Sequence, residues 1–248
     1  MYSELFIVQA LLQAVLLVWV WKIWRRTGLL VAACLLIPQF GLVWDNLIVG
    51  LGRFIGLSPL LEALSWPRFW LHWLFGTWLI VAAASALRLA GFARMQGTRP
   101  MLLFCSLTLA LMLFDLPHFW RDSLHPVCEF DLIRYSTAVA AENFCFPEQV
   151  AVRSTPPVAS IITCFVVIGC GFVLLLRRRF PWTFAGGVLM LASAMPPLRD
   201  YKLDNFGEIL IAGGCIWAIA RFSADRSSKG WSSLGRNAAD DTERSRAV

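Results

Sequence analysis

Three side chains of this 248-residue sequence could carry proton-transfer chemistry: Asp45, His72 and Glu208. Each stands in or beside a long apolar run, where an ionisable group is costly unless it is paired, hydrated or functional. A carboxylate and an imidazole act as general base and general acid when they lie within hydrogen-bond reach of a substrate. If the protein is an enzyme, we predict that these three residues are its catalytic groups.

Other polar residues flank the same apolar runs. Arg68 precedes His72 by four residues, so the two share one helical face, and we expect Glu208 to meet both. Gln9 and Gln13 are also four apart and are predicted to point into a helix bundle. The predicted ligand-binding residues are Asn46, Arg68, Asp115, His118 and Asn205.

These residues also have structural interpretations. Charged groups near the end of a membrane helix can extend to water, and Asp204 can cap the helix that follows it. Arg68 with either Asp45 or Glu208 can form a purely structural ion pair, or Arg68 can bind an anion. The sequence leaves both open.

Two histidines and several carboxylates could also ligate zinc or iron. The sequence has no HExxH motif, no GxSxG nucleophile elbow and no phosphate-binding glycine loop to make such a function specific. We therefore predict no metal site, and the sequence names no cofactor.

The composition is that of a membrane protein. Hydrophobic residues make up 58% of the chain and charged residues 15%, with a mean hydropathy of +0.65, whereas soluble domains are about 45–50% apolar. The net charge of +6 comes from short basic runs between apolar segments, not from one soluble face. We therefore predict membrane lipid as the partner and no binding of nucleic acid.

The apolar runs predict an all-α fold, a polytopic bundle of about seven spans, because about 20 helical residues cross the hydrocarbon core. The connection 52–67 is predicted to lie at the membrane interface, so that Asp45 and Asn46 end the second span and Arg68 and His72 begin the third. The predicted spans are residues 5–24, 29–50, 68–87, 101–116, 161–176, 184–195 and 203–221.

Basic residues follow the first, third and fifth spans, which puts the N-terminus outside and the C-terminus inside. The candidate site residues then fall in the outer half of the bundle. We expect a multi-pass protein of a bacterial inner membrane. Residues 1–222 would form the membrane domain with an external loop at 119–157, and residues 223–248 a disordered basic cytoplasmic tail.

Two of the seven cysteines, Cys128 and Cys145, lie in the external loop. An oxidising compartment would allow a disulfide between them, closing a loop of under ~20 residues, and two free thiols are the alternative. Their spacing matches no zinc pattern. The other five cysteines lie in predicted spans, where a cysteine is typically a small buried apolar residue.

The runs WDNLIVGLG, PRFWLHWLF and DNFGEIL resemble a family of multi-span membrane proteins without a settled activity. Its marks are an Asp-Asn pair before a glycine, Arg-Phe-x-x-His after a loop, and Asn-x-Gly-Glu near the C-terminus; the likeness covers about two thirds of the chain. Trp44, Asp45 and Asn46 are also similar to the Trp-Asp-Asn run of membrane-type lycopene cyclases, in which carboxylates protonate a polyene. That resemblance implies a proton-donating role for Asp45, although only Glu62 stands where those cyclases carry an acidic pair.

Three functions are compatible with these features. The first is an integral membrane protein with an outer-side polar cavity that binds or transforms a lipid-like or isoprenoid molecule. The second is a small transporter or proton-coupled carrier, and the third is a structural or assembly protein without catalysis. Transport needs a polar route to both faces, and the candidate residues lie toward one face, so we favour the first. The sequence leaves the oligomeric state open.

The predicted orientation can be tested with a reporter enzyme that is active only outside the cytoplasm. The reporter should be active when fused after Val127 and inactive when fused after Arg94 or at the C-terminus, because successive loops alternate between the two sides. Activity at the C-terminus would rule out the seven-span arrangement.

Overall fold

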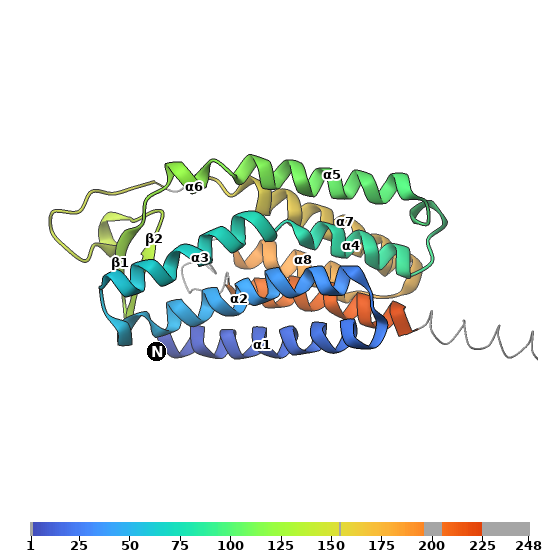
Figure 1. Ribbon diagram of the computed structural model, residues 1–248, viewed down its shortest axis with the longest axis horizontal. Coiled ribbons are helices and arrows are strands. Elements are labelled where there is room, and N and C mark those ends of the chain that lie inside the picture. The colour runs from blue at the N-terminus through green and yellow to red at the C-terminus, as the bar shows by residue number, and fades with distance from the viewer. Residues whose placement is uncertain (1, 154, 196–204, 225–248) are drawn as a thin grey trace, which may run out of the picture.

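The computed structural model describes residues 2–153, 155–195 and 205–224. They form an elongated bundle of helices with a small β-hairpin at one end (Figure 1). The helices fit the predicted membrane-protein class: within the described residues, 5 helices are long and apolar enough to cross a membrane, or 6 if one bent pair counts as a span.

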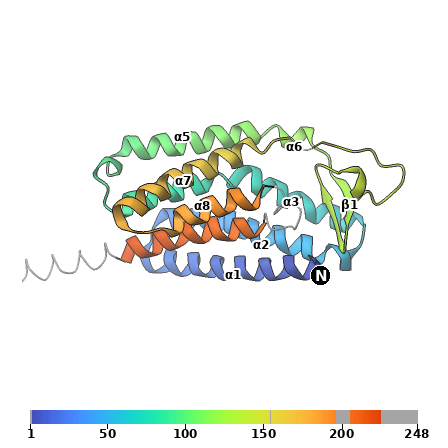
Figure 2. The same ribbon diagram turned by 180° about the vertical axis from the view of Figure 1, so that it is seen from behind.

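The helices run mostly along the length of the bundle, and Figure 2 shows α7, α8 and the C-terminal helix on its back. Two short 3-10 helices are η1 (Ala93–Met95) and η2 (Ala141–Asn143). The α-helices are α1 (Tyr2–Thr27), α2 (Leu30–Ile55), α3 (Pro59–Phe75), α4 (Trp78–Leu89), α5 (Thr98–Asp115), α6 (His118–Arg121), α7 (Val158–Arg178), α8 (Trp182–Ser193) and the C-terminal helix (Asn205–Ala224).

The predicted bounds of the connection 52–67 are wrong, because most of this segment is helical. Helix α2 continues to Ile55, and α3 already begins at Pro59. Ser58 caps α3 by accepting a hydrogen bond from the Leu61 N–H at 3.3 Å, and proline is favoured at the first helical position. Asp45 therefore lies 55 − 45 = 10 residues, or ~15 Å, before the end of α2, and not at its end.

The predicted third span is not one straight helix. Helices α3 and α4 meet at Gly76 and Thr77 with a bend of 42°. The bend puts His72 in the last turn of α3, inside the length of the bundle. Helix α8 has 12 residues, or ~18 Å, which is short of the ~30 Å hydrocarbon core. Seven spans therefore remain a prediction.

The described residues are mostly helical, as predicted, but the loop 119–157, which was predicted to be external, contains an antiparallel hairpin. Strands β1 (His125–Glu129) and β2 (Leu132–Ser136) pair with Val127 opposite Arg134. Such short strands, between an apolar helix and a polar loop, give little periodic signal in the sequence.

The hairpin is joined to the start of α1 through Asp131. Its carboxylate accepts hydrogen bonds from the N–H groups of Tyr2 at 2.9 Å and Ser3 at 3.1 Å, and it pairs with Arg53 at 3.1 Å. Burial raises the pKa of Asp131, but hydrogen bonds, including that from the Ser3 N–H, lower it by more, so the pKa lies below its ordinary value. The carboxylate therefore stays ionised and caps α1.

The predicted disulfide between Cys128 and Cys145 is present, with an S–S distance of 2.08 Å. It joins β1 to the loop that follows the hairpin. Of the cysteines in helices, Cys164, Cys170 and Cys215 are buried as predicted. Cys105 is exposed on α5, so the prediction is wrong for that residue.

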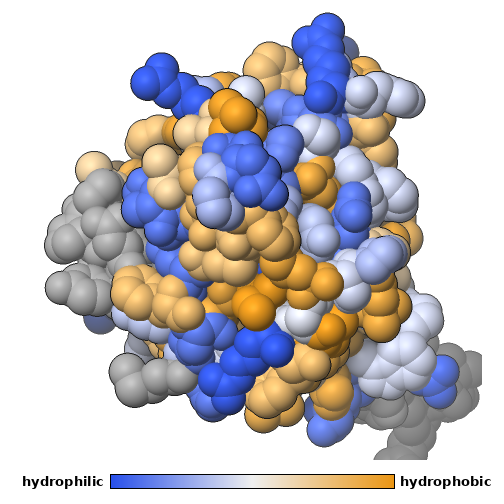
Figure 3. Space-filling view, turned by 90° about the vertical axis from the view of Figure 1, so that its left-hand side faces the viewer, coloured by the Kyte–Doolittle hydropathy of each residue, from blue (hydrophilic) through white to orange (hydrophobic). Residues whose placement is uncertain are grey.

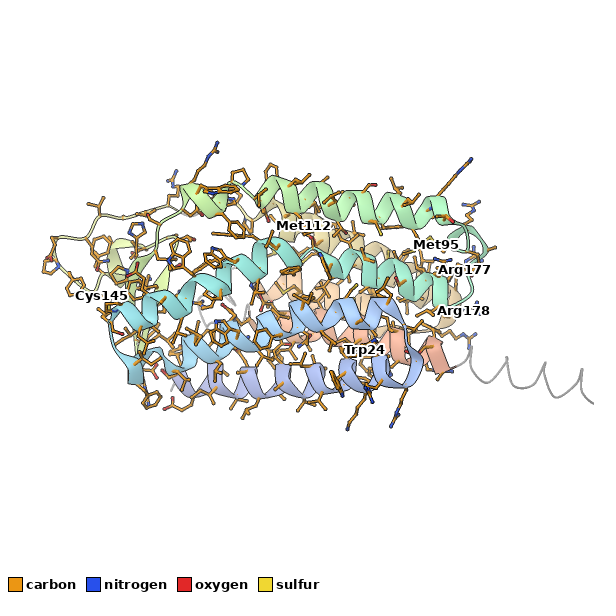
Figure 4. All side chains as sticks on the ribbon, viewed as in Figure 1. Trp24, Met95, Met112, Cys145, Arg177 and Arg178 are labelled. Carbon is orange, nitrogen blue, oxygen red and sulfur yellow. A yellow bond between two sulfur atoms is a disulfide. The ribbon has the colours of Figure 1, made fainter. Side chains whose placement is uncertain are left out.

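The two ends of the bundle differ in charge and structure. Figure 4 places Cys145 at the hairpin end and Arg177 and Arg178 at the opposite end. Figure 3 looks onto the hairpin end, where polar and apolar residues are mixed. Between the ends, α1, α5 and α7 expose large apolar side chains such as Leu11, Leu103 and Phe165, which suits contact with lipid.

Glycines bring α7, α8 and the C-terminal helix close together. A Cβ added to Gly186 on α8 would lie 2.3 Å from the Leu210 carbonyl oxygen, and one added to Gly171 would lie 2.4 Å from the Phe184 nitrogen. Small residues of this kind allow membrane helices to pack backbone against backbone.

This packing predicts the effect of one added methyl group. Gly186→Ala should destabilise the protein by about 1–3 kcal/mol, because the backbone of the C-terminal helix must move. The matched control is Gly169→Ala on α7, where an added Cβ meets no heavy atom within 4 Å. Thermal unfolding in detergent should show a lower midpoint for the Gly186 variant only. Equal shifts would contradict the close packing.

Candidate functional site

A buried ion pair lies at the centre of the predicted site. Arg68 Nε of α3 donates to Asp45 Oδ1 of α2 at 2.7 Å. The other oxygen, Asp45 Oδ2, accepts from Asn205 Nδ2 of the C-terminal helix at 3.0 Å. Asp45 and Arg68 are only 7% and 5% exposed. The pair therefore joins three helices and satisfies both carboxylate oxygens.

Neighbouring polar groups complete this network. Asn205 Nδ2 also donates to Asn46 Oδ1 at 3.2 Å, and Asn46 Nδ2 donates to the Leu42 carbonyl at 2.8 Å. Arg68 Nη1 donates to the carbonyl of Tyr135 in β2 at 3.2 Å, so the network reaches the hairpin. A buried polar network in which each member has a partner fixes one arrangement of the elements that it joins.

A second polar pair lies beside this network. His72 Nε2 of α3 and Glu208 Oε1 of the C-terminal helix are 3.0 Å apart, which brings together two predicted catalytic residues 136 positions apart in the chain. Their side chains are 36% and 15% exposed. Asp45 and Arg68 lie close enough for their charges to act on His72. The expected contact of Glu208 with His72 is therefore present, whereas Arg68 makes its ion pair with Asp45.

The His72–Glu208 pair lines a cavity of about 80 Å³ among α2, α3, α7, α8 and the C-terminal helix. The wall is mostly apolar, and it also carries polar groups that the sequence did not single out. That volume holds a few water molecules or the small polar end of a larger molecule. The additional polar side chains are Gln39, Ser160 and Thr163, and the sulfur-containing side chains of Cys164 and Met190 also line the wall.

These additional residues gave no signal that sequence reasoning could use. Thr163 and Ser160 lie in an apolar helix, where a hydroxyl commonly bonds to its own backbone, as Thr163 does to the Ala159 carbonyl at 2.8 Å. Gln39 lies near the middle of α2, and no charged residue adjoins it in the sequence. Only the packing of helices shows that these groups share a cavity with His72.

The remaining predicted site residues lie elsewhere. His118, at the start of α6, stacks on Trp73 with ring centroids 5.3 Å apart and bonds to Asp122 at 2.9 Å. Asp115 is the last residue of α5, near His118. Neither residue lines the cavity of His72 and Glu208. Asp204 lies outside the described residues.

The geometry of the His72–Glu208 pair suits proton transfer. A histidine and a glutamate at 3.0 Å can share a proton and pass it to a group in the cavity. Within the described residues, no group of three or more His, Cys, Asp or Glu side chains is placed to hold a metal ion.

Comparison of the sequence with models of known protein families finds no match, and comparison with curated proteins finds no significant match. The function of this chain is therefore inferred from its site.

The buried ion pair predicts strong coupling between its members. Arg68→Met should destabilise the protein by about 3–5 kcal/mol, because Asp45 is left as an unpaired buried charge. Adding Asp45→Asn should recover part of that loss, since the charge is then removed. Both effects can be measured by thermal unfolding in detergent.

The control is Arg53→Met, which removes an arginine that pairs with Glu4 and Asp131 at a more exposed position. Its effect should be small, because ion pairs near water contribute little to stability. If the destabilisations caused by the Asp45 and Arg68 substitutions were additive, the two side chains would not depend on each other.

Proposed function

We propose that this chain is an integral membrane protein that binds a lipid-like or isoprenoid molecule at the His72–Glu208 cavity and transfers a proton to or from it. In this proposal the chain crosses a bacterial inner membrane about seven times, with the N-terminus and the hairpin outside. The basic end of the bundle, which includes Arg177 and Arg178, then faces the cytoplasm.

The observation that carries the proposal is the position of an acid–base pair on an apolar wall. His72 and Glu208 lie 3.0 Å apart, and their neighbours around the cavity include Leu42, Leu71 and Ile211. Ligand sites are typically concave and mostly apolar, with a few convergent polar groups that set orientation. This arrangement suits a ligand with one reactive or polar end and an apolar body.

The size of the cavity defines how much of the ligand enters it. A space of about 80 Å³ admits one end of a molecule, whereas whole drug-sized ligands need about 300–1,000 Å³. The rest of the ligand would remain against the apolar outer surfaces of the bundle, in the lipid. A lipid-like molecule meets this requirement because its body is already dissolved in the bilayer.

Asp45 has a different role in this proposal from the one that the sequence predicts. Both of its carboxylate oxygens accept hydrogen bonds, from Arg68 and Asn205, so it positions α3 and does not supply the proton. The transferred proton lies between His72 and Glu208.

Glu208→Gln tests the proposal because it keeps the shape of the side chain and removes its charge. The variant should express and remain monodisperse, while any lipid-like molecule that co-purifies with the unaltered protein should fall at least ~10-fold in occupancy, as the loss of one charge-assisted hydrogen bond allows. Mass spectrometry of the protein purified in mild detergent measures the amount of protein and the amount of bound molecule.

Glu62→Gln is the matched control, because Glu62 lies in the first turn of α3 and does not line the cavity. It should leave the occupancy unchanged. Equal occupancy in the two variants, or no specific molecule with the unaltered protein, would contradict a lipid site at Glu208.

A further inference from the structure

Three glutamines form a second polar site inside the bundle, between α1 and α2. Gln9, Gln13 and Gln39 are 1%, 0% and 3% exposed. Gln39 Nε2 donates to both the carbonyl oxygen and the side-chain Oε1 of Gln13, at 3.0 Å for the carbonyl. Three other amide atoms are buried without a hydrogen-bond partner: Gln9 Nε2, Gln9 Oε1 and Gln13 Nε2.

The unpartnered atoms lie well inside the apolar length of α1. Counting from Tyr2, Gln9 is 9 − 2 = 7 residues into the helix and Gln13 is 13 − 2 = 11, which correspond to ~10 and ~16 Å. A buried polar group with no partner costs about 1–3 kcal/mol. Three such atoms on two neighbouring turns would be a large fraction of the stability of a domain, so they need an occupant that bonds to them.

We propose that Gln9, Gln13 and Gln39 bind internal water that extends the His72–Glu208 cavity into the α1–α2 interface. Gln39 connects the two sites, because it bonds to Gln13 and also lines the cavity. The unpartnered atoms include two N–H donors and one carbonyl acceptor. Water fits this mixture because it both donates and accepts, whereas a metal cation would be repelled by the N–H groups.

The water gives the His72–Glu208 pair contact with a hydrated interior at a depth where lipid surrounds the bundle. Protons can then exchange along hydrogen-bonded water and need no opening of the helices. This hydration does not depend on which molecule enters the cavity, so it stands independently of the proposed lipid site.

Cysteine accessibility tests the proposal. In protein whose five free cysteines are replaced by alanine, Gln13→Cys should react with 2-aminoethyl methanethiosulfonate at least ~10-fold faster than Ala10→Cys, because the reagent requires a thiolate, which forms only in water. Ala10 is a suitable control, since it lies on the same helix and is 4% exposed. Equal rates in two monodisperse variants would overturn the proposal.

A measurement on the unaltered protein decides the matter if the cysteine variants do not fold. A structure at a resolution that shows ordered water should place water within ~3.2 Å of Gln9 Nε2 or Oε1 and of Gln13 Nε2. Amides with no water beside them would overturn the proposal. Neither result depends on whether Glu208→Gln loses a lipid, so failure of this proposal is distinct from failure of the proposed function.

Discussion

The Asp45–Arg68 ion pair is the interaction on which the rest of the site depends. Asp45 and Arg68 are 7% and 5% exposed. Two charges so buried are tolerated only when they pair with each other and when their remaining hydrogen-bonding groups also have partners. Asn205 and the Tyr135 carbonyl supply two of those partners. Because His72 is four residues after Arg68 on α3, the rotation that directs Arg68 to Asp45 also directs His72 toward the same side of the helix, where Glu208 lies.

The polar residues of the bundle fall into two classes that differ in how fully they are satisfied. Asp45, Asn46 and Asn205 bond mainly to one another and to Arg68, so their chemistry is used to hold helices together. His72 and Glu208 pair at the wall of a cavity, where a further molecule can reach them. In the proposed function, stability and reactivity are thus assigned to neighbouring residues of the same three helices.

The sequence predicted those features that depend on local composition or on a single chemical requirement. Apolar runs identified most helices, and the predicted external position of Cys128 and Cys145 identified their disulfide. The sequence could not decide the partner of Arg68, because Asp45 and Glu208 are both carboxylates predicted at the same end of the bundle. Only the packing of α2 against α3 shows that Asp45 is the partner. The start of α3 was missed although Ser58 and Pro59 mark it, since the apolar segment before Arg68 suggested an interfacial loop.

The hairpin illustrates a constraint that no single segment of sequence contains. It lies outside the apolar helices, yet Arg68 reaches the Tyr135 carbonyl and a Cβ on Gly52 of α2 would lie 1.8 Å from the Ile133 carbonyl oxygen. Backbone groups of β2 therefore pack directly on α2 and bond to the ion pair. Since Asp131 also caps α1, the hairpin holds the ends of two helices and a member of the buried network. The hairpin can thus set the geometry of polar residues within the bundle, because Arg68 of the buried ion pair donates one of its hydrogen bonds to it.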